Sequence, residues 1–265
     1  MQFTGSLSWP NRRRTGIIQI LPLLKRDWYG FRKHFLVYLA LWIIIPTLIH
    51  LILVIPLSRL IILEVRYLNR AAAGIWATSA GMASFIETSV RIRKINYETA
   101  QIDTILQSPI SNLDFLTALS LRGVIFGFIQ FIFAIFITCT LNHEYFGALS
   151  IFMIIIQVMS VILFFSALGI LMGLLVSNRI IFFQMSLVLF LFIIMGIGAF
   201  IPISSYPESY LFIANKIPLT ILVQNLQSII IHQSVQWLNY FLTLALTLLL
   251  FCFTLIISNK VFRNI

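Results

Sequence analysis

Residues that could carry out chemistry are few in this sequence, and their spacing matches no reactive site. The four histidines are far apart along the chain: His34, His50, His143 and His232. The pair His143-Glu144 is followed by Tyr-Phe-Gly, so the zinc-protease motif H-E-x-x-H is absent. None of the lysines follows a glycine, which excludes the phosphate-binding motif G-x-x-x-x-G-K-[S/T]. We therefore expect no catalytic residue, no cofactor and no metal in this chain, and no ATPase site of its own.

A compact run of charged residues is the main exception to an apolar sequence. It reads RIRKINYETAQIDTILQSPISNLDF and covers residues 91–115. Ile95, Ile102 and Leu106 fall on one face of a helix, with charged residues elsewhere on its surface. The segment therefore suits docking of a polar partner, although an ordinary solvated loop is the alternative. The expected contact residues are Arg93, Lys94, Glu98, Ile102, Ile105 and Leu106.

The end of this segment carries signals for a helix break and a new helix start. Pro109 cannot continue a helix. Ser111 is a favoured N-terminal cap, and Asp114 lies three residues later as its capping-box partner. We expect a helix, a break and a second helix that begins at the mouth of the next apolar stretch.

The elements around this segment are predicted to be membrane helices. Hydrophobic residues make up 60% of the chain and charged residues 10%, against about 25% charged in soluble domains. We predict an all-α polytopic membrane protein, a single domain over residues 1–265, because several apolar runs reach about 20 residues. The six expected spans are 35–57, with Pro46 as a kink, then 71–90, 117–141, 149–176, 180–201 and 237–258. Span 71–90 is the least apolar, and its Ala73, Ala77 and Gly81 favour close helix packing.

Two further segments are predicted to lie at the membrane surfaces. The N-terminal segment 1–34 is expected to be cytoplasmic or interfacial. Within it and the start of the first span, residues 21–35 would form an interfacial helix that presents Leu24, Trp28, Phe31 and Phe35 to lipid and its cations to headgroups. Residues 202–236 are apolar in places but carry prolines and uncharged polar groups. We expect two short helices that dip into the outer leaflet and return, with a seventh span as the alternative.

The distribution of basic residues predicts the orientation. With six spans, fourteen lysines and arginines lie on the side of the two termini and four on the other side. Both termini and residues 91–115 are therefore expected in the cytoplasm. The net charge of +10 is explained by this asymmetry, and we expect no nucleic-acid partner.

The chain resembles the membrane subunit of a type-2 ABC exporter in two phrases and in their order. The first is ILQSPISNLDFLTALSLRG, residues 105–123, at the position of the coupling helix that joins the second and third spans of that family. The second is YPESYLFIANKIPLTILVQNLQ, residues 206–227, in the outer re-entrant hairpin. Its matching residues are Pro207, Pro218, Leu219 and Thr220. Many relatives carry an arginine shortly afterwards, whereas this chain has Gln224 and Gln227.

The resemblance implies a permease that works as a dimer with two ABC nucleotide-binding subunits, which bind ATP and magnesium. Gly123 with Gly127, and Gly169 with Gly173, could pack between subunits or only within one. The expected function is export of a lipid, a lipid-linked glycan or an amphipathic drug-like molecule across the cytoplasmic (inner) membrane of a bacterial cell. Contact with membrane lipids follows from that location. A membrane-embedded lipid-modifying enzyme and a non-transporting scaffold are the alternatives.

Overall fold

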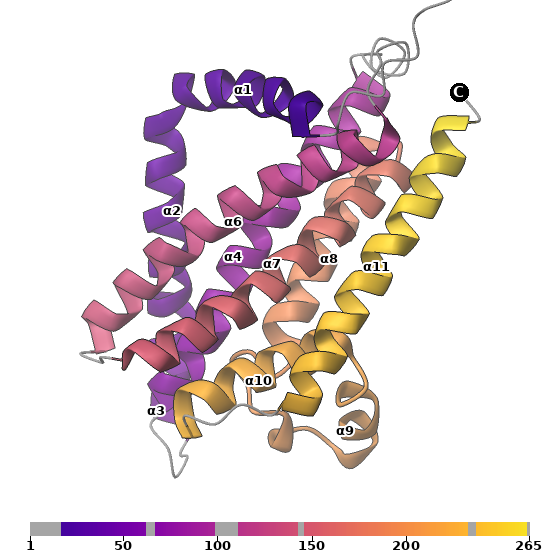
Figure 1. The fold of residues 1–265 in the computed structure, drawn as a ribbon. Coiled ribbons are helices and arrows are strands. Elements are labelled where there is room, and N and C mark those ends of the chain that lie inside the picture. Colours follow the sequence, from indigo (N-terminus) through magenta and orange to yellow (C-terminus); the bar gives the residue numbers. More distant parts are fainter. Residues whose placement is uncertain (1–16, 62–66, 99–110, 143–145, 233–236, 264–265) are drawn as a thin grey trace, which may run out of the picture.

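The computed structural model describes residues 17–61, 67–98, 111–142, 146–232 and 237–263 (Figure 1). Over these residues the chain forms helices and no strand, which confirms the predicted all-α class. The long helices are α1 (Ile17–Lys33), α2 (Phe35–Ile49), α4 (Tyr67–Arg93), α6 (Asn112–Asn142), α7 (Ala148–Leu175), α8 (Arg179–Gly196), α10 (Pro218–His232) and α11 (Trp237–Arg263). The short elements are η1 (His50–Val54), α3 (Ile55–Leu60), η2 (Lys94–Glu98), η3 (Ile203–Ser205) and α9 (Glu208–Ala214).

Five stretches of the described residues are long and apolar enough to cross a membrane. They are Phe35–Leu60, Asn112–Asn142, Ala148–Leu175, Arg179–Gly196 and Trp237–Ser258. Each overlaps a span predicted from the sequence. Helix α4 has the length of a span, at 27 residues, but does not meet the same hydropathy criterion.

Helix α4 lies in the centre of the bundle and packs along α6 and α7 (Figure 1). All of its residues from 71 to 81 are buried. Small residues make this packing close: a Cβ added to Gly81 would lie 2.4 Å from the Phe165 ring. A Cβ added to Gly169 of α7 would lie 2.8 Å from the carbonyl oxygen of Phe85. The small-residue pattern of α4 therefore packs within the subunit.

Helical structure continues past Val90, the predicted end of the second span. Helix α4 runs to Arg93, and the π-helical turn η2 continues it to Glu98. The physical reason is that Ile92 and Ile95 prolong the apolar face and are buried against Phe115, Ile170 and their neighbours. Residues 91–98 are therefore a continuation of α4 and do not start a separate helix.

Helix α2 contains a proline whose lost backbone bond is replaced from another helix. Pro46 has no N–H to donate to the carbonyl of Trp42, four residues earlier. The side-chain Nε2 of Gln130 on α6 donates to that carbonyl at 3.1 Å instead. The π-helical turn η1 follows at His50. Gln130 is buried, so this bond fixes α2 against α6 inside the bundle.

Helix α1 lies across one end of the bundle, and the chain turns from it into α2 (Figure 1). The start of α6 and the end of α11 lie at the same end, which we call the α1 end. Phe31 of α1 is buried with Trp42 and Phe126 and contacts the Phe126 ring edge-on at 5.3 Å. Phe31 therefore joins α1 to α2 and α6, whereas Trp28 is exposed.

The opposite end is closed by the segment between α8 and α11. Helix α8 ends at Gly196, which corrects the predicted limit of Ile201. The chain turns there because Gly198 has φ +78°, a conformation that residues with a side chain rarely adopt. Gln227 of α10 donates to the Gly198 carbonyl at 2.9 Å, and Tyr67 of α4 donates to the Phe200 carbonyl at 3.0 Å. The two predicted short helices are α9 and α10.

Candidate functional site

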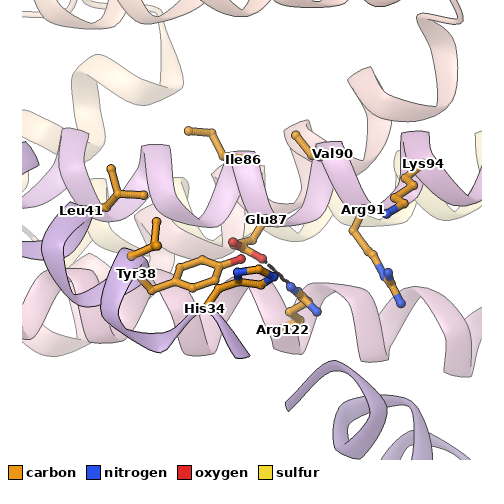
Figure 2. Close-up of a pocket in the computed structure, with 10 residues that line it drawn as sticks. His34, Tyr38, Leu41, Ile86, Glu87, Val90, Arg91, Lys94 and Arg122 are labelled. Atoms are coloured by element: carbon orange, nitrogen blue, oxygen red, sulfur yellow. Dashed lines mark hydrogen bonds and ion pairs between the residues drawn. The ribbon is translucent and has the colours of Figure 1, made fainter. Parts of the chain in front are cut away.

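Four charged side chains from three helices form an ion-pair network at the α1 end. Asp27 of α1 accepts from Arg91 of α4 at 2.8 Å and pairs with Arg122 of α6 at 3.0 Å, each through a different carboxylate oxygen. The same Arg122 donates through Nη2 and Nε to Glu87 of α4 at 2.7 and 3.0 Å. Figure 2 shows the Glu87–Arg122 pair with the Tyr38 hydroxyl of α2 beside it. The network therefore ties α1, α4 and α6 together.

The network is largely shielded from solvent, since its side chains are between 12% and 22% exposed. The Arg122 guanidinium also lies over the Phe126 ring, 5.2 Å from its centre. Two arginines balance two carboxylates, so the group carries little net charge. Isolated charges are costly in such surroundings, and each of these has an opposite charge within hydrogen-bond distance.

A cavity of about 470 Å³ lies beside the network, between α2 and α4 (Figure 2). Its walls combine charged and apolar side chains. The lining residues are His34, Val37, Tyr38, Leu41, Ile86, Glu87, Val90, Arg91, Lys94 and Arg122. This arrangement can bind a molecule with a polar and an apolar part.

Arg93 does not lie on an exposed docking surface, as the sequence analysis predicted. Its side chain is buried, and its Nη2 donates to the Ser177 carbonyl at 3.0 Å, in the turn between α7 and α8. The guanidinium also lies 5.7 Å from the centre of the Phe182 ring. The interpretation of Arg93 as an exposed contact residue is wrong, because the continued α4 turns it toward α7 and α8. Lys94, the next residue, is exposed.

The turn η2 is held against α7 by a tyrosine. Tyr97 donates its hydroxyl to the Leu174 carbonyl at 2.5 Å. Burial raises the pKa of this phenol, so it stays protonated and keeps donating at neutral pH. Together with Arg93, this bond fixes the chain up to Tyr97 on the end of α7.

The start of α6 has a side-chain cap at Ser111. The Ser111 hydroxyl oxygen accepts from the backbone N–H of Asp114 at 3.1 Å. It also donates to the Asp114 carboxylate at 2.6 Å. The carboxylate thus bonds the hydroxyl of the cap, in place of the backbone N–H that a capping box uses. Pro109 and the expected contact residues Ile102, Ile105 and Leu106 lie outside the described residues, as does the side chain of Glu98.

The residues singled out in the predicted outer hairpin mainly shape the two short helices. Pro207 is the N-cap of α9, and Pro218 is the first residue of α10, where a missing N–H costs nothing. Leu219 and Thr220 are buried, so they pack inside the chain. Gln227, one of the two glutamines that follow Thr220, donates to the backbone carbonyl of Gly198 at the turn after α8.

Asp27 is the site residue that sequence reasoning missed. It lies 64 positions from Arg91, and no local pattern links the two. A usable signal was available in Glu87 and Arg122, which are rare charges at the ends of predicted apolar spans. Such charges need partners, and Asp27 lies in the helix that leads to the first span.

In a comparison with known families, residues 18–231 match the model of the ABC-2 type transporter. These residues run from α1 almost to the end of α10. A comparison with curated proteins found no significant match. Proteins of this family are the membrane-spanning permeases of ABC transporters, and they normally work with an ATP-binding subunit. With its apolar helices, the chain is a multi-pass membrane protein, and it belongs to the ABC-2 type transporter family.

Proposed function

We propose that this permease belongs to an ATP-driven exporter and moves a lipid, a lipid-linked glycan or an amphipathic drug-like molecule across the cytoplasmic membrane. ATP and magnesium are bound by a separate nucleotide-binding subunit. In this proposal α4 is the sixth span, and the α1 end faces the cytoplasm, as the excess of basic residues there favours. Family membership supports the transport role.

The observation that carries the proposal is the way α4 and α6 are joined at the α1 end. Residues 99–110 connect these two helices, and the ion-pair network links both helices to α1 about two to three turns away. Arg93 and Tyr97 fix the same region to α7. A force applied to residues 91–115 by a nucleotide-binding subunit would therefore move several helices as a unit.

The exposed apolar helices support a second copy and a lipid environment. Helix α8 has the smallest buried share of the five candidate spans, at 17% of its window. Its outward side chains include Phe183, Leu187, Val188 and Leu191. We propose that a second permease subunit covers part of this surface and that lipid covers the rest.

The test is ATP hydrolysis by the purified chain with and without its nucleotide-binding subunit. We expect no hydrolysis by the chain alone and hydrolysis by the co-purified complex reconstituted in vesicles. A variant of the nucleotide-binding subunit that cannot hydrolyse ATP is the control for contaminating activity. Robust hydrolysis by the isolated chain would contradict the proposal.

A further inference from the structure

A groove of about 280 Å³ lies between α6, α7 and α11, three of the helices that are long and apolar enough to cross a membrane. Figure 1 shows these helices side by side. The residues that line the groove are uncharged, and three of them carry a hydroxyl group: Thr117, Ser120 and Thr247. The other lining residues are Leu121, Val124, Leu163, Leu248 and Phe251. The groove therefore suits an uncharged and mainly apolar group.

The groove opens to the surroundings of the bundle. Each of the three helices contributes a leucine that lines the groove and remains between 40% and 55% exposed: Leu121 of α6, Leu163 of α7 and Leu248 of α11. Around membrane-crossing helices these surroundings are lipid, so an acyl chain can enter the groove from the side.

Ser120 gives the groove one hydroxyl group that has nothing to bond. Its side chain is only 6% exposed, and its Oγ has no hydrogen-bond partner among the described residues. The other two hydroxyl groups donate to carbonyls of their own helices, Thr117 to Asp114 at 2.9 Å and Thr247 to Thr243 at 2.8 Å. Because an unpaired buried hydroxyl costs free energy, a ligand with one neutral acceptor beside Ser120 is favoured.

The depth of Ser120 in the membrane indicates which acceptor it meets. The Glu87–Arg122 pair is expected near the edge of the hydrocarbon layer, because charges are costly at its centre. Ser120 comes two residues before Arg122 on α6, which is about 3 Å along the helix axis. Ser120 therefore lies near the level where ester groups join lipid headgroups to acyl chains.

Beyond Ser120 the groove becomes aliphatic. Val124 lies about one turn further along α6, away from the α1 end. Ser166 of α7 donates to the Ser120 backbone carbonyl at 3.5 Å, which aligns the two helices. Leu163, three residues before Ser166, lies further from the α1 end as well, because α7 runs toward that end. The groove thus continues as a hydrocarbon surface in the direction of an acyl chain.

We propose that this groove binds one acyl chain of an ester-linked membrane lipid. The Ser120 hydroxyl donates to the ester carbonyl, and the chain lies along Val124, Leu163 and Leu248. Because the lining is uncharged, the site reads the ester and the chain, whatever the headgroup. With the α1 end in the cytoplasm, as proposed above, the lipid belongs to the inner leaflet. This role does not require the lipid to be the transported substrate.

The test compares two lipids that differ only in the ester carbonyl. The full chain in mild detergent is titrated with dioleoyl phosphatidylcholine and with the ether-linked phosphatidylcholine that has the same chain length and unsaturation. Native mass spectrometry measures the affinity of the first bound lipid. We expect the ester lipid to bind about two- to ten-fold more tightly, the affinity equivalent of one neutral hydrogen bond.

Two variants locate the site. Ser120→Ala removes the donor, so it should bind the ester lipid as weakly as the ether lipid. Val124→Trp should fill the aliphatic part and weaken binding of both lipids. The matched control is Ser186→Ala on α8, which removes a buried hydroxyl that donates to the Phe182 carbonyl at 2.8 Å, outside the groove. Ser120→Ala is a small change and remains informative if Val124→Trp does not fold.

Three results would overturn the proposal. Equal binding of the ester and ether lipids by the unmodified chain would show that no carbonyl is recognised. An equal loss of ester preference in Ser120→Ala and Ser186→Ala would place the recognition elsewhere. Unchanged lipid binding by a folded Val124→Trp variant would show that the groove is not the site. Ester preference that is lost in Ser120→Ala and kept in Ser186→Ala supports the site.

Discussion

At the scale of single residues, the described charges at the α1 end hold helices together. Asp27 has two arginine partners, one on α4 and one on α6. Arg122 has two acidic partners, on α1 and α4. Because each carboxylate is only 13% exposed, removing one member leaves another charge with fewer partners in a poorly solvated position. The network is thus expected to behave as a unit.

The first prediction is that Asp27→Asn destabilises the chain by about 1–3 kcal/mol, between the values for exposed and fully buried ion pairs. The amide keeps the shape but removes the charge that holds Arg91 and Arg122. Thermal unfolding in detergent measures the effect. Glu208→Gln, an exposed acid in the first turn of α9, is the control and should change little. Equal effects of the two variants would contradict the structural role of Asp27.

The second prediction concerns neighbouring basic residues with different environments. Arg93→Glu should lower the free energy of unfolding by about 3–5 kcal/mol, because it buries an acid against the Ser177 carbonyl in place of a hydrogen-bond donor. Lys94→Glu, on the exposed side of η2, should leave folding nearly unchanged. Size-exclusion profiles and unfolding temperatures of the two variants test this. Similar stability would mean that Arg93 is not buried as described.

The sequence predicted local arrangements at this scale better than distant ones. The Ser111–Asp114 interaction joins residues three positions apart, so a short pattern contains all the information. The Asp27–Arg91 pair joins residues 64 positions apart, and it depends on how α1 lies against the bundle. The position of Arg93 was mispredicted for a related reason. Its charge suggested an exposed side chain, but the prolonged α4 turns this side chain toward α7 and α8.

At the scale of helices, α4 is held between two glycine-containing faces. Gly123 and Gly127 of α6 lie against Ser84, Thr88 and Ala80 of α4. Gly169 and Gly173 of α7 lie against Phe85, Thr88 and Ser89 of the same helix. Of the two roles left open by the sequence, these glycines therefore serve packing within the subunit. The pattern showed that close packing would occur, but it could not show which helix was the partner.

The third prediction is that Gly169→Ala separates α4 from α7. The new methyl group would lie 2.3 Å from the Thr88 hydroxyl oxygen and 2.8 Å from a backbone oxygen, so the helices must shift. We expect a loss of stability of about 1–3 kcal/mol, typical of overpacking. Gly30→Ala is the matched control, because nothing lies within 4 Å of its added Cβ and alanine favours helix. A neutral Gly169→Ala would show that the two helices are less closely packed.

The fourth prediction concerns the connection between α4 and α6. Ile102→Asp should release the nucleotide-binding subunit, since losing a well-packed apolar residue at the centre of an interface costs about 2 kcal/mol or more. Ile102→Val is the control and should retain assembly. Co-purification and substrate export are the readouts. If Ile102→Asp assembles and exports normally, residues 91–115 do not form the docking surface.

At the scale of the whole molecule, composition predicted the class, and hydropathy predicted most of the spans. Where the structure differs, local chemistry decided the boundary: buried isoleucines prolong α4, and the turn at Gly198 follows the early end of α8. The arrangement at the end of the bundle opposite α1 could not be predicted in detail. Its hydrogen bonds join residues that are far apart in the sequence, Gly198 with Gln227 and Tyr67 with Phe200.

The fifth prediction is the orientation of the chain. In a background lacking Cys139 and Cys252, single cysteines at positions 144 and 208 should react with a membrane-impermeant thiol reagent in intact cells. Cysteines at positions 111 and 264 should react only after the membrane is opened. The basic residues concentrated at the α1 end are the reason. Labelling of position 111 from outside would overturn the arrangement.

The central position of α4 has a consequence for how the protein is made. This helix is buried by α6 and α7 and is less apolar than the five spans beside it, yet it leaves the ribosome before either partner. On its own, α4 is expected to insert poorly into the bilayer, because insertion depends on the hydrophobicity of the helix. In the proposed six-span arrangement, the insertion machinery is therefore expected to retain α4 until α6 and α7 have been synthesised. Chains that end before α7 are expected to leave α4 poorly inserted and open to quality-control proteases.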